Sequence, residues 1–164
     1  MDLNFSIRPF EESEDLEGCA QMMCLSEPWI TLGRDYEASI ATLRDQSRER
    51  YVAESGGDLA GFLIINMAGA FVGYIQTVCV APGFRGRGIG TKLVRFAEER
   101  IFPESPNVFL CVSSFNAGAR RLYERLGYGV VGELKDYVVE GHSEILMRKS
   151  LGPTTGFRRG HSER

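Results

Sequence analysis

Residues 80–90 read VAPGFRGRGIG and are rich in glycine and arginine. The preceding stretch, GYIQTVCVAP, has the apolar, β-branched composition of a strand and closes at Pro82. After the stretch, Ile89, Leu93 and Ala97 repeat at helical intervals. A helix that begins directly after a glycine-rich turn offers unpaired N–H groups and the positive end of its dipole, so an anion is its natural ligand. The stretch therefore predicts a strand, a basic loop and a helix, with an anion-binding site at the loop.

Two widespread phosphate-binding patterns do not fit this loop. The P-loop requires Gly-Lys followed by Ser or Thr, but Lys92 follows Thr91 rather than a glycine. The dinucleotide fingerprint GxGxxG fails as well, because the third glycine after Gly86 and Gly88 is misplaced at Gly90. Its acidic ribose partner is also missing, since the chain reads LCVSSF at the expected distance. A solvated basic turn without a ligand is the alternative interpretation.

The rest of the chain supplies alternating strand and helix patterns. Strands are expected at 5–10, 50–55, 59–67, 73–82, 107–112, 127–139 and 143–149, and helices at 11–25, 34–46, 89–101 and 116–128. Gly56-Gly57-Asp58 predicts a hairpin turn, and Gly127 predicts a helix end. This order predicts an α/β fold, a mixed central sheet of about six to seven strands flanked by about four helices. We expect a single domain over residues 1–150 and a flexible tail over 151–164, which lacks apolar periodicity.

Composition and charge exclude several classes of function. The net charge of −3 does not favour a nucleic-acid partner. The four cysteines lack CxxC spacing and there are only two histidines, so we expect no metal site. No apolar run approaches the roughly 20 residues of a membrane span. We therefore expect a cytoplasmic protein, a monomer or homodimer, without membrane or nucleic-acid partners.

Two motifs resemble the GNAT superfamily of acyl-CoA-dependent N-acyltransferases. The acyl-CoA signature of that family, (R or Q)-x-x-G-x-(G or A), is similar to the chain at Arg85, Gly88 and Gly90. A second family motif, N-x-x-A-x-x-L-Y-x-x-x-G-(F or Y), is matched by Asn116, Ala119, Leu122, Tyr123, Gly127 and Tyr128. The expected order of elements over residues 5–150 also resembles the family.

The resemblance implies an N-acetyltransferase that moves an acetyl group from acetyl-CoA to a primary amine by direct attack in a ternary complex. Backbone amides from Arg85 to Thr91 would cradle the pyrophosphate of coenzyme A, and the strand at 78–80 would pair with the pantetheine arm. The Val78 amide would face the thioester oxygen. Cys79 lies beside this position but is interpreted as core packing. The implied cofactor-binding residues are Val78, Cys79, Val80, Arg85, Gly86, Arg87, Gly88, Ile89, Gly90, Thr91, Asn116, Ala119 and Tyr123.

The resemblance makes Tyr123 the proton donor to the departing thiolate. A phenol with a reference pKa of about 10 stays protonated at neutral pH, as such a donor must. Asn116 lies two helical turns earlier on the same face, with the small Ala119 between them. The alternatives are that Tyr123 fills the core and that Asn116 caps the helix; capping and cofactor contact are compatible.

No carboxylate occupies the positions where relatives carry a general base. The matching positions hold Gln76, Tyr74 and Cys111. We expect Gln76 to position a water that carries the proton away. Glu27, His142 and Glu144 are substitutes, each interpreted first as a surface residue.

The acceptor amine is left open between a small molecule and a peptide or protein amine. The candidate substrate-binding residues are Glu27, Trp29, Tyr36, Tyr74 and Tyr137. Aromatic residues at such positions serve equally often as packing. A catalytically weak acyl-CoA-binding sensor is the alternative function, and nucleic-acid binding through Arg85 and Arg87 is a third interpretation.

Overall fold

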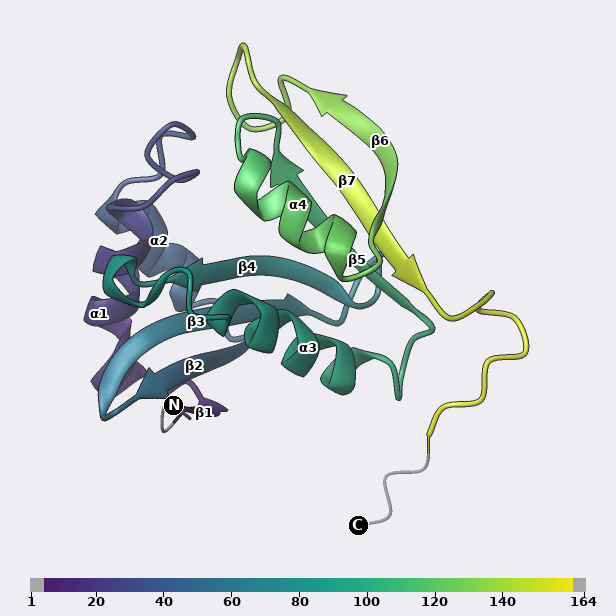
Figure 1. The fold of residues 1–164 in the computed structure, drawn as a ribbon, viewed down its shortest axis with the longest axis horizontal. Helices are drawn as coiled ribbons and strands as arrows, with labels where there is room; N and C mark the ends of the chain where they lie inside the picture. Colours follow the sequence, from purple (N-terminus) through teal and green to yellow (C-terminus); the bar gives the residue numbers. More distant parts are fainter. Residues whose placement is uncertain (1–4, 161–164) are drawn as a thin grey trace. The chain divides into compact units, whose positions relative to one another are not determined.

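The computed structural model describes residues 5–160 and has an α/β fold (Figure 1). Seven strands form a mixed sheet in the order β1-β2-β3-β4-β5-β7-β6, with four α-helices and one short 3-10 helix. This confirms the predicted fold class. The elements are β1 (Phe5–Pro9), α1 (Glu12–Cys24), α2 (Tyr36–Leu43), β2 (Glu49–Ser55), β3 (Asp58–Asn66), β4 (Tyr74–Val80), the 3-10 helix (Pro82–Phe84), α3 (Ile89–Ile101), β5 (Asn107–Ser113), α4 (Ala117–Arg125), β6 (Gly129–Lys135) and β7 (Ser143–Ser150).

The chain forms two compact units. The first comprises the residues up to Ile64 together with Thr77–Leu93, and the second comprises Ile65–Gln76 and the residues from Val94 onward. The strands β3 and β4 and the helix α3 each contribute residues to both units.

In the first unit, α1 and α2 lie side by side (Figure 1). Their apolar faces close one core with β2, β3 and β4, built from Leu16, Cys19, Ala20, Met23, Leu43, Val52, Phe62, Ile64 and Cys79. β1 pairs antiparallel with β2 from Phe5 opposite Ser55 to Pro9 opposite Tyr51. The predicted turn between β2 and β3 has positive φ angles of 63° and 89° at Gly56 and Gly57, which glycine adopts without strain.

In the second unit, β5 pairs parallel to β4 and antiparallel to β7, and β7 pairs antiparallel with β6. The helix α4 lies across β5 and β7 (Figure 1). Gly127 follows α4 with a φ of 95°, as its position in the sequence predicts. The Lys149 Nζ atom on β7 pairs with the Glu98 carboxylate on α3 at 3.0 Å.

The strand β6 is shorter than predicted. It ends at Lys135 because Asp136 adopts a φ of 51° and its carboxylate accepts a hydrogen bond from the Gly141 N–H at 2.7 Å. Residues 137–139 therefore lie in the β6–β7 loop rather than in a strand.

Residues 151–160 form no helix or strand, although Leu151 and Gly160 donate backbone hydrogen bonds to Pro106 and Pro103. The remaining predicted tail residues, 161–164, lie outside the described residues. None of the helices formed between Phe5 and Gly160 has the length and apolar character that a membrane crossing requires.

Candidate active site

The predicted anion-binding loop lies in the first unit, between β4 and α3. Gly86 and Gly88 have φ angles of 73° and 80°, and a Cβ added to either would meet nothing within 4 Å. The side of the loop that a side chain would block is therefore open. The Lys92 N–H donates a hydrogen bond to the Gly88 carbonyl at the start of α3. The backbone N–H groups of a helix's first turn have no partner within the helix. These features suit an anion held by backbone amides.

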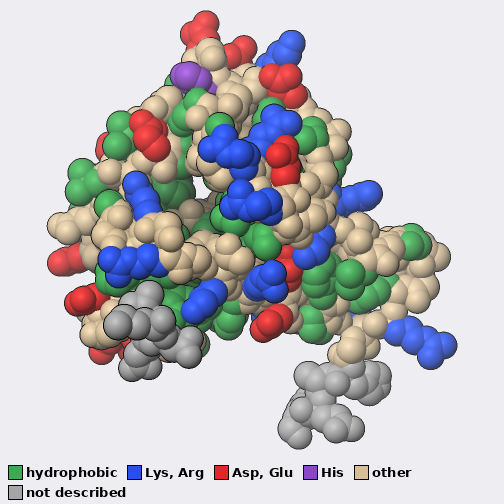
Figure 2. Space-filling view, viewed as in Figure 1, with side chains coloured by type: hydrophobic (Ala, Val, Ile, Leu, Met, Phe, Trp, Pro, Cys, Tyr) green, Lys and Arg blue, Asp and Glu red, His purple; other side chains and the backbone are tan. Residues whose placement is uncertain are grey.

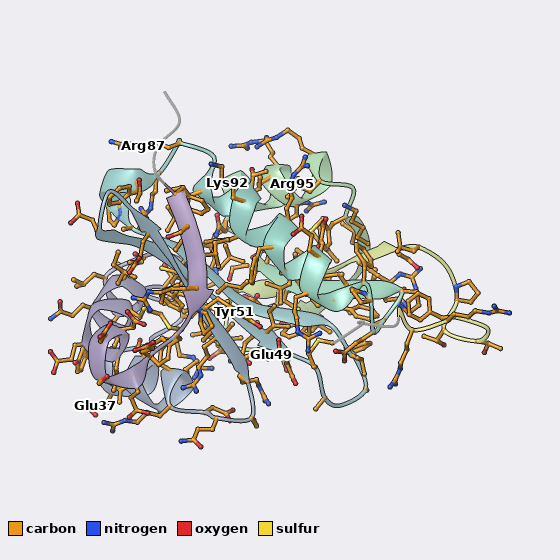
Figure 3. The ribbon with its side chains drawn as sticks, turned by 90° about the horizontal axis from the view of Figure 1, so that it is seen from below. Glu37, Glu49, Tyr51, Arg87, Lys92 and Arg95 are labelled. Carbon is orange, nitrogen blue, oxygen red and sulfur yellow. The ribbon has the colours of Figure 1, made fainter. Side chains whose placement is uncertain are left out.

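The cationic side chains of this loop differ in what they contact. Arg85 turns back into its own unit: its Nε donates to the Val80 carbonyl at 3.1 Å and its Nη2 to the Ser26 hydroxyl at 3.0 Å. Arg87 and Lys92 are exposed, over the rings of Phe84 and Phe5 respectively (Figure 3). Arg85 thus braces the loop through these hydrogen bonds, and all three cationic side chains are exposed.

The strand segment before the loop alternates between half-buried and buried residues. Val78 and Val80 are half-buried, and Cys79 is 2% exposed. Burial raises the pKa of the Cys79 thiol to about 12, although Arg85 and Ser26 act in the opposite direction. Cys79 belongs to the core of the first unit, in agreement with its interpretation as a packing residue.

The second predicted motif lies in the second unit, on α4. Asn116 caps the helix by accepting a hydrogen bond from the Ala119 N–H at 3.3 Å. Tyr123 is 8% exposed, and its ring meets Tyr128 edge-on at a centroid distance of 6.0 Å. Burial raises the pKa of Tyr123 to about 12, so the phenol keeps its proton at neutral pH.

Three of the predicted acceptor residues lie in the first unit. The Glu27 carboxylate accepts hydrogen bonds from the N–H and the hydroxyl of Thr31, at 3.2 and 3.0 Å. Trp29 and Tyr36 pack against the core described above. These two aromatic side chains therefore contribute to packing, which was the alternative to a substrate-binding role.

The other two predicted acceptor residues meet in the second unit. Tyr74 on β4 and Tyr137 in the β6–β7 loop line one cavity of about 340 Å³. The other lining residues are Asn66, Ala68, Gly69, Ala70, Phe71, Cys111, Leu134 and Leu146. Sequence reasoning missed Phe71 and Leu134, which come from the β3–β4 loop and β6.

Glu144 on β7 is buried, so its interpretation as a surface residue is wrong. It is 7% exposed, and its Oε1 accepts a hydrogen bond from the Ser113 hydroxyl at 2.6 Å. Burial raises the pKa of Glu144, and the Ser113 hydrogen bond opposes that shift. Burial also raises the pKa values of Tyr74 and Cys111, and the Glu144 carboxylate adds to both shifts. Gln76, the predicted water-positioning residue, is exposed on β4.

Positive charge is local in this chain, whose net charge is −3. Figure 2 shows Lys and Arg side chains over α4, whose exposed residues include Arg120, Arg121 and Arg125. No group of three or more His, Cys, Asp or Glu side chains that could hold a metal ion occurs within the described part of the chain.

Comparisons with known proteins agree with both motifs. Residues 14–128 match the model of the acetyltransferase (GNAT) family. The N-alpha-acetyltransferase RimI of Mycobacterium tuberculosis is 32% identical over 138 residues, which cover 81% of this chain and 82% of that protein. The spermidine N(1)-acetyltransferase of Escherichia coli K12 is 27% identical over 129 residues, covering 76% and 68%.

A solved structure shows the same fold. The spermidine N-acetyltransferase from Vibrio cholerae, in complex with CoA and spermine, has a TM-score of 0.70 at 18% identity and covers 89% of this chain and 95% of that one. The family model spans most of the chain, and the match to RimI, at 32% identity, covers four fifths of it. The chain belongs to the acetyltransferase (GNAT) family.

Proposed function

We propose that the protein transfers an acetyl group from acetyl-CoA to a primary amine by direct attack in a ternary complex. That it is an acetyl-CoA-dependent N-acetyltransferase follows from its family; the route and the residue roles are the proposal. The observation that carries it is the loop with open, positive-φ glycines at the start of α3.

The residues of the first unit suit the binding of the acyl donor. Backbone amides of the loop, Arg85–Thr91, would hold the pyrophosphate, with Arg87 adding charge nearby. The backbone of Val78–Val80 would pair with the pantetheine arm, and the Val78 N–H would donate to the acetyl oxygen. Acetyl-CoA supplies the acetyl group as an activated thioester. Asn116 and Ala119 of the second unit are the further proposed donor contacts, and the Asn116 cap is compatible with this role.

Tyr123 would give its proton to the departing sulfur. Its burial keeps the phenol protonated, because the charged form would lose its hydration. Gln76 on β4 is proposed to hold a water close to the acceptor. The names of the two relatives reported above point to two acceptor types, an α-amine and a polyamine.

The test is mass spectrometry after incubation with acetyl-CoA and a panel of peptides, polyamines, amino acids and amino sugars. We expect an acetylated amine, and Tyr123→Phe should slow its formation by about 10²–10⁴-fold, the usual contribution of a general acid. The acetyl-CoA Kd should stay nearly unchanged. Tyr51→Phe is the matched control: it also removes a tyrosine hydroxyl, but one that donates a hydrogen bond to the Glu49 carboxylate on β2 and has no proposed catalytic role (Figure 3). Saturable acetyl-CoA binding without any acetylated amine would instead favour the sensor alternative.

A further inference from the structure

The strands β5, β7 and β6 bring two rows of side chains to one face of the second unit. In the first row, Leu146 lies opposite Cys111 on one side and Gly132 on the other. In the next row, Glu144 lies opposite Ser113 and Leu134. Because side chains alternate between faces with a period of two, both rows point the same way. Cys111, Leu146 and Leu134 line the cavity, so Glu144 belongs to the same face as the cavity.

The opposite face of these strands is closed. Leu110, Val112, Ile145 and Met147 alternate with the cavity residues and are all buried. The helix α4 lies across β5 and β7 (Figure 1), yet none of the cavity's lining residues comes from α4. The helix that carries Tyr123 thus contributes nothing to the lining of the cavity.

The lining of the cavity carries no formal charge. Its side chains are aromatic, aliphatic or small, and the polar groups among them are an amide, two phenols and a thiol. The Phe71 ring is held against Phe109 at a centroid distance of 4.8 Å. A second or third ammonium group in such a cavity would lose hydration while Glu144, the carboxylate that borders the cavity, is engaged by the reacting amine, so its burial is costly. An uncharged apolar substituent fits this chemistry.

Glu144 is the carboxylate that borders the cavity. Its Oε1 is held by Ser113, and it acts electrostatically on Tyr74 and Cys111, which both line the cavity. The enclosed side-chain N and O atoms without a partner between Phe5 and Gly160 are Asn107 Oδ1 and the Tyr128 hydroxyl. The Ser113 bond to Oε1 is the hydrogen bond that the described residues make to the Glu144 carboxylate, so Oε2 is not engaged by it.

We propose that this face is the acceptor site, that the cavity takes the uncharged apolar substituent of a singly charged primary amine, and that Glu144 takes the proton which this amine releases. The α-amine of a peptide that begins with Met, Leu or Phe belongs to this class, whereas polyamines do not. The assignment rests on the proposed acetyl transfer.

The step balances with the residues already described. The protonated amine first loses one proton to water and becomes a neutral nucleophile, and its nitrogen then forms a bond to the acetyl carbon while the carbon–sulfur bond breaks. The amine proton passes to the Glu144 carboxylate, and the sulfur takes the proton of Tyr123. Exchange with water then returns a proton to Tyr123 and removes one from Glu144.

Substrate preference tests the cavity. We expect kcat/KM for a Leu-starting peptide to exceed that for spermidine by at least about 10-fold, the factor that 1.4 kcal/mol corresponds to. Leu134→Asp should lower this ratio by at least about 10-fold by placing a carboxylate at the cavity. Val131→Asp, on an exposed position of the same strand, is the control and should leave the ratio unchanged. A wild-type preference for spermidine, or equal ratios in both variants, would overturn the assignment of the cavity.

The pH dependence of kcat tests Glu144. Glu144→Gln should lower kcat at neutral pH by about 10²–10⁴-fold and move the acid-side limb of the profile to the pKa of the amine itself, about 8 for an α-amine. Ser113→Ala removes a hydrogen bond that lowers the pKa of Glu144, so the acid limb should move to higher pH. The groups facing Glu144 in the described residues are Ser113 and Cys111 on β5, Tyr74 on β4 and the apolar Leu134 on β6. A merely structural Glu144 would alter Tm and leave the limb in place.

These outcomes separate the two proposals. If no amine on the panel is acetylated while acetyl-CoA binds, the proposed function itself fails. If amines are acetylated but Glu144→Gln keeps the wild-type kcat profile, the proposed function stands and the role of Glu144 is wrong.

Discussion

Asp15 in the first turn of α1 is 4% exposed and accepts three hydrogen bonds from two groups of the first unit. Its two oxygens accept hydrogen bonds from the Arg8 guanidinium at 2.8 and 2.9 Å, and Oδ2 also accepts from the Glu11 N–H at 2.7 Å. Arg8 in turn pairs with Glu54 on β2. Glu12 on the same helix also pairs with an arginine, Arg44, but both side chains of this pair are exposed to solvent.

We expect Asp15→Ala to lower the free energy of unfolding by about 2–3 kcal/mol, because it leaves a half-buried guanidinium with one partner fewer. Glu12→Ala should cost less than about 1 kcal/mol, as exposed ion pairs do. Urea denaturation of the two variants measures both values. Equal losses would show that burial does not distinguish the two pairs.

At the scale of elements, the β4–α3 loop combines two demands on glycine. The backbone must adopt positive φ values at Gly86 and Gly88, and the space above must stay free for a ligand. Gly56 in the β2–β3 turn has a similar φ of 63° and equally open surroundings, but no proposed ligand. Comparing the two turns separates the backbone requirement from binding.

Gly88→Ala and Gly56→Ala should each destabilise the fold by about 1–2 kcal/mol, the cost of a side chain in the left-handed region. Gly88→Ala should also weaken acetyl-CoA binding by roughly 10-fold or more, since 1.4 kcal/mol of lost contact has that effect. Isothermal titration calorimetry measures the acetyl-CoA Kd of both variants. An unchanged acetyl-CoA Kd in Gly88→Ala would remove the loop from the donor site.

Local signals explain why most elements were predictable. Pro82 ends β4, two adjacent glycines turn β2 into β3, and Gly127 ends α4, all through the conformational limits of single residues. The end of β6 was missed because it depends on a hydrogen bond from the Gly141 N–H to Asp136 across the loop. Such a contact leaves no pattern in the strand itself.

Pairing between distant strands explains what was missed in the candidate site. Glu144 is buried because β5, 31 residues earlier, supplies Ser113 as its partner. The alternation of side chains could have predicted that Glu144 and Leu146 share a face of the sheet. It could not have predicted which strands flank Glu144. The contact of Arg85 with Ser26 spans 59 residues and is equally invisible in the sequence. The motif residues, by contrast, were found because each lies within one short stretch.

At the scale of the whole molecule, binding of acetyl-CoA must be linked to stability. A ligand present at 100 times its Kd stabilises the folded state by about 2.7 kcal/mol. For a chain of 164 residues, this corresponds to a rise in Tm of roughly 5–11 °C. Thermal scans with and without acetyl-CoA should show this rise in the wild type and in Tyr123→Phe. No rise in either protein would contradict donor binding by this chain.

Neither unit is a continuous piece of chain. The chain passes from one unit to the other between Ile64 and Ile65, between Gln76 and Thr77, and between Leu93 and Val94. A single cut after Leu93 keeps all residues of the first unit on one fragment, but it separates Ile65–Gln76 from the rest of the second unit. No single cut therefore releases the second unit whole. The lining of the proposed acceptor cavity comes from both segments of the second unit, so recombination at one junction does not transfer this cavity as a whole.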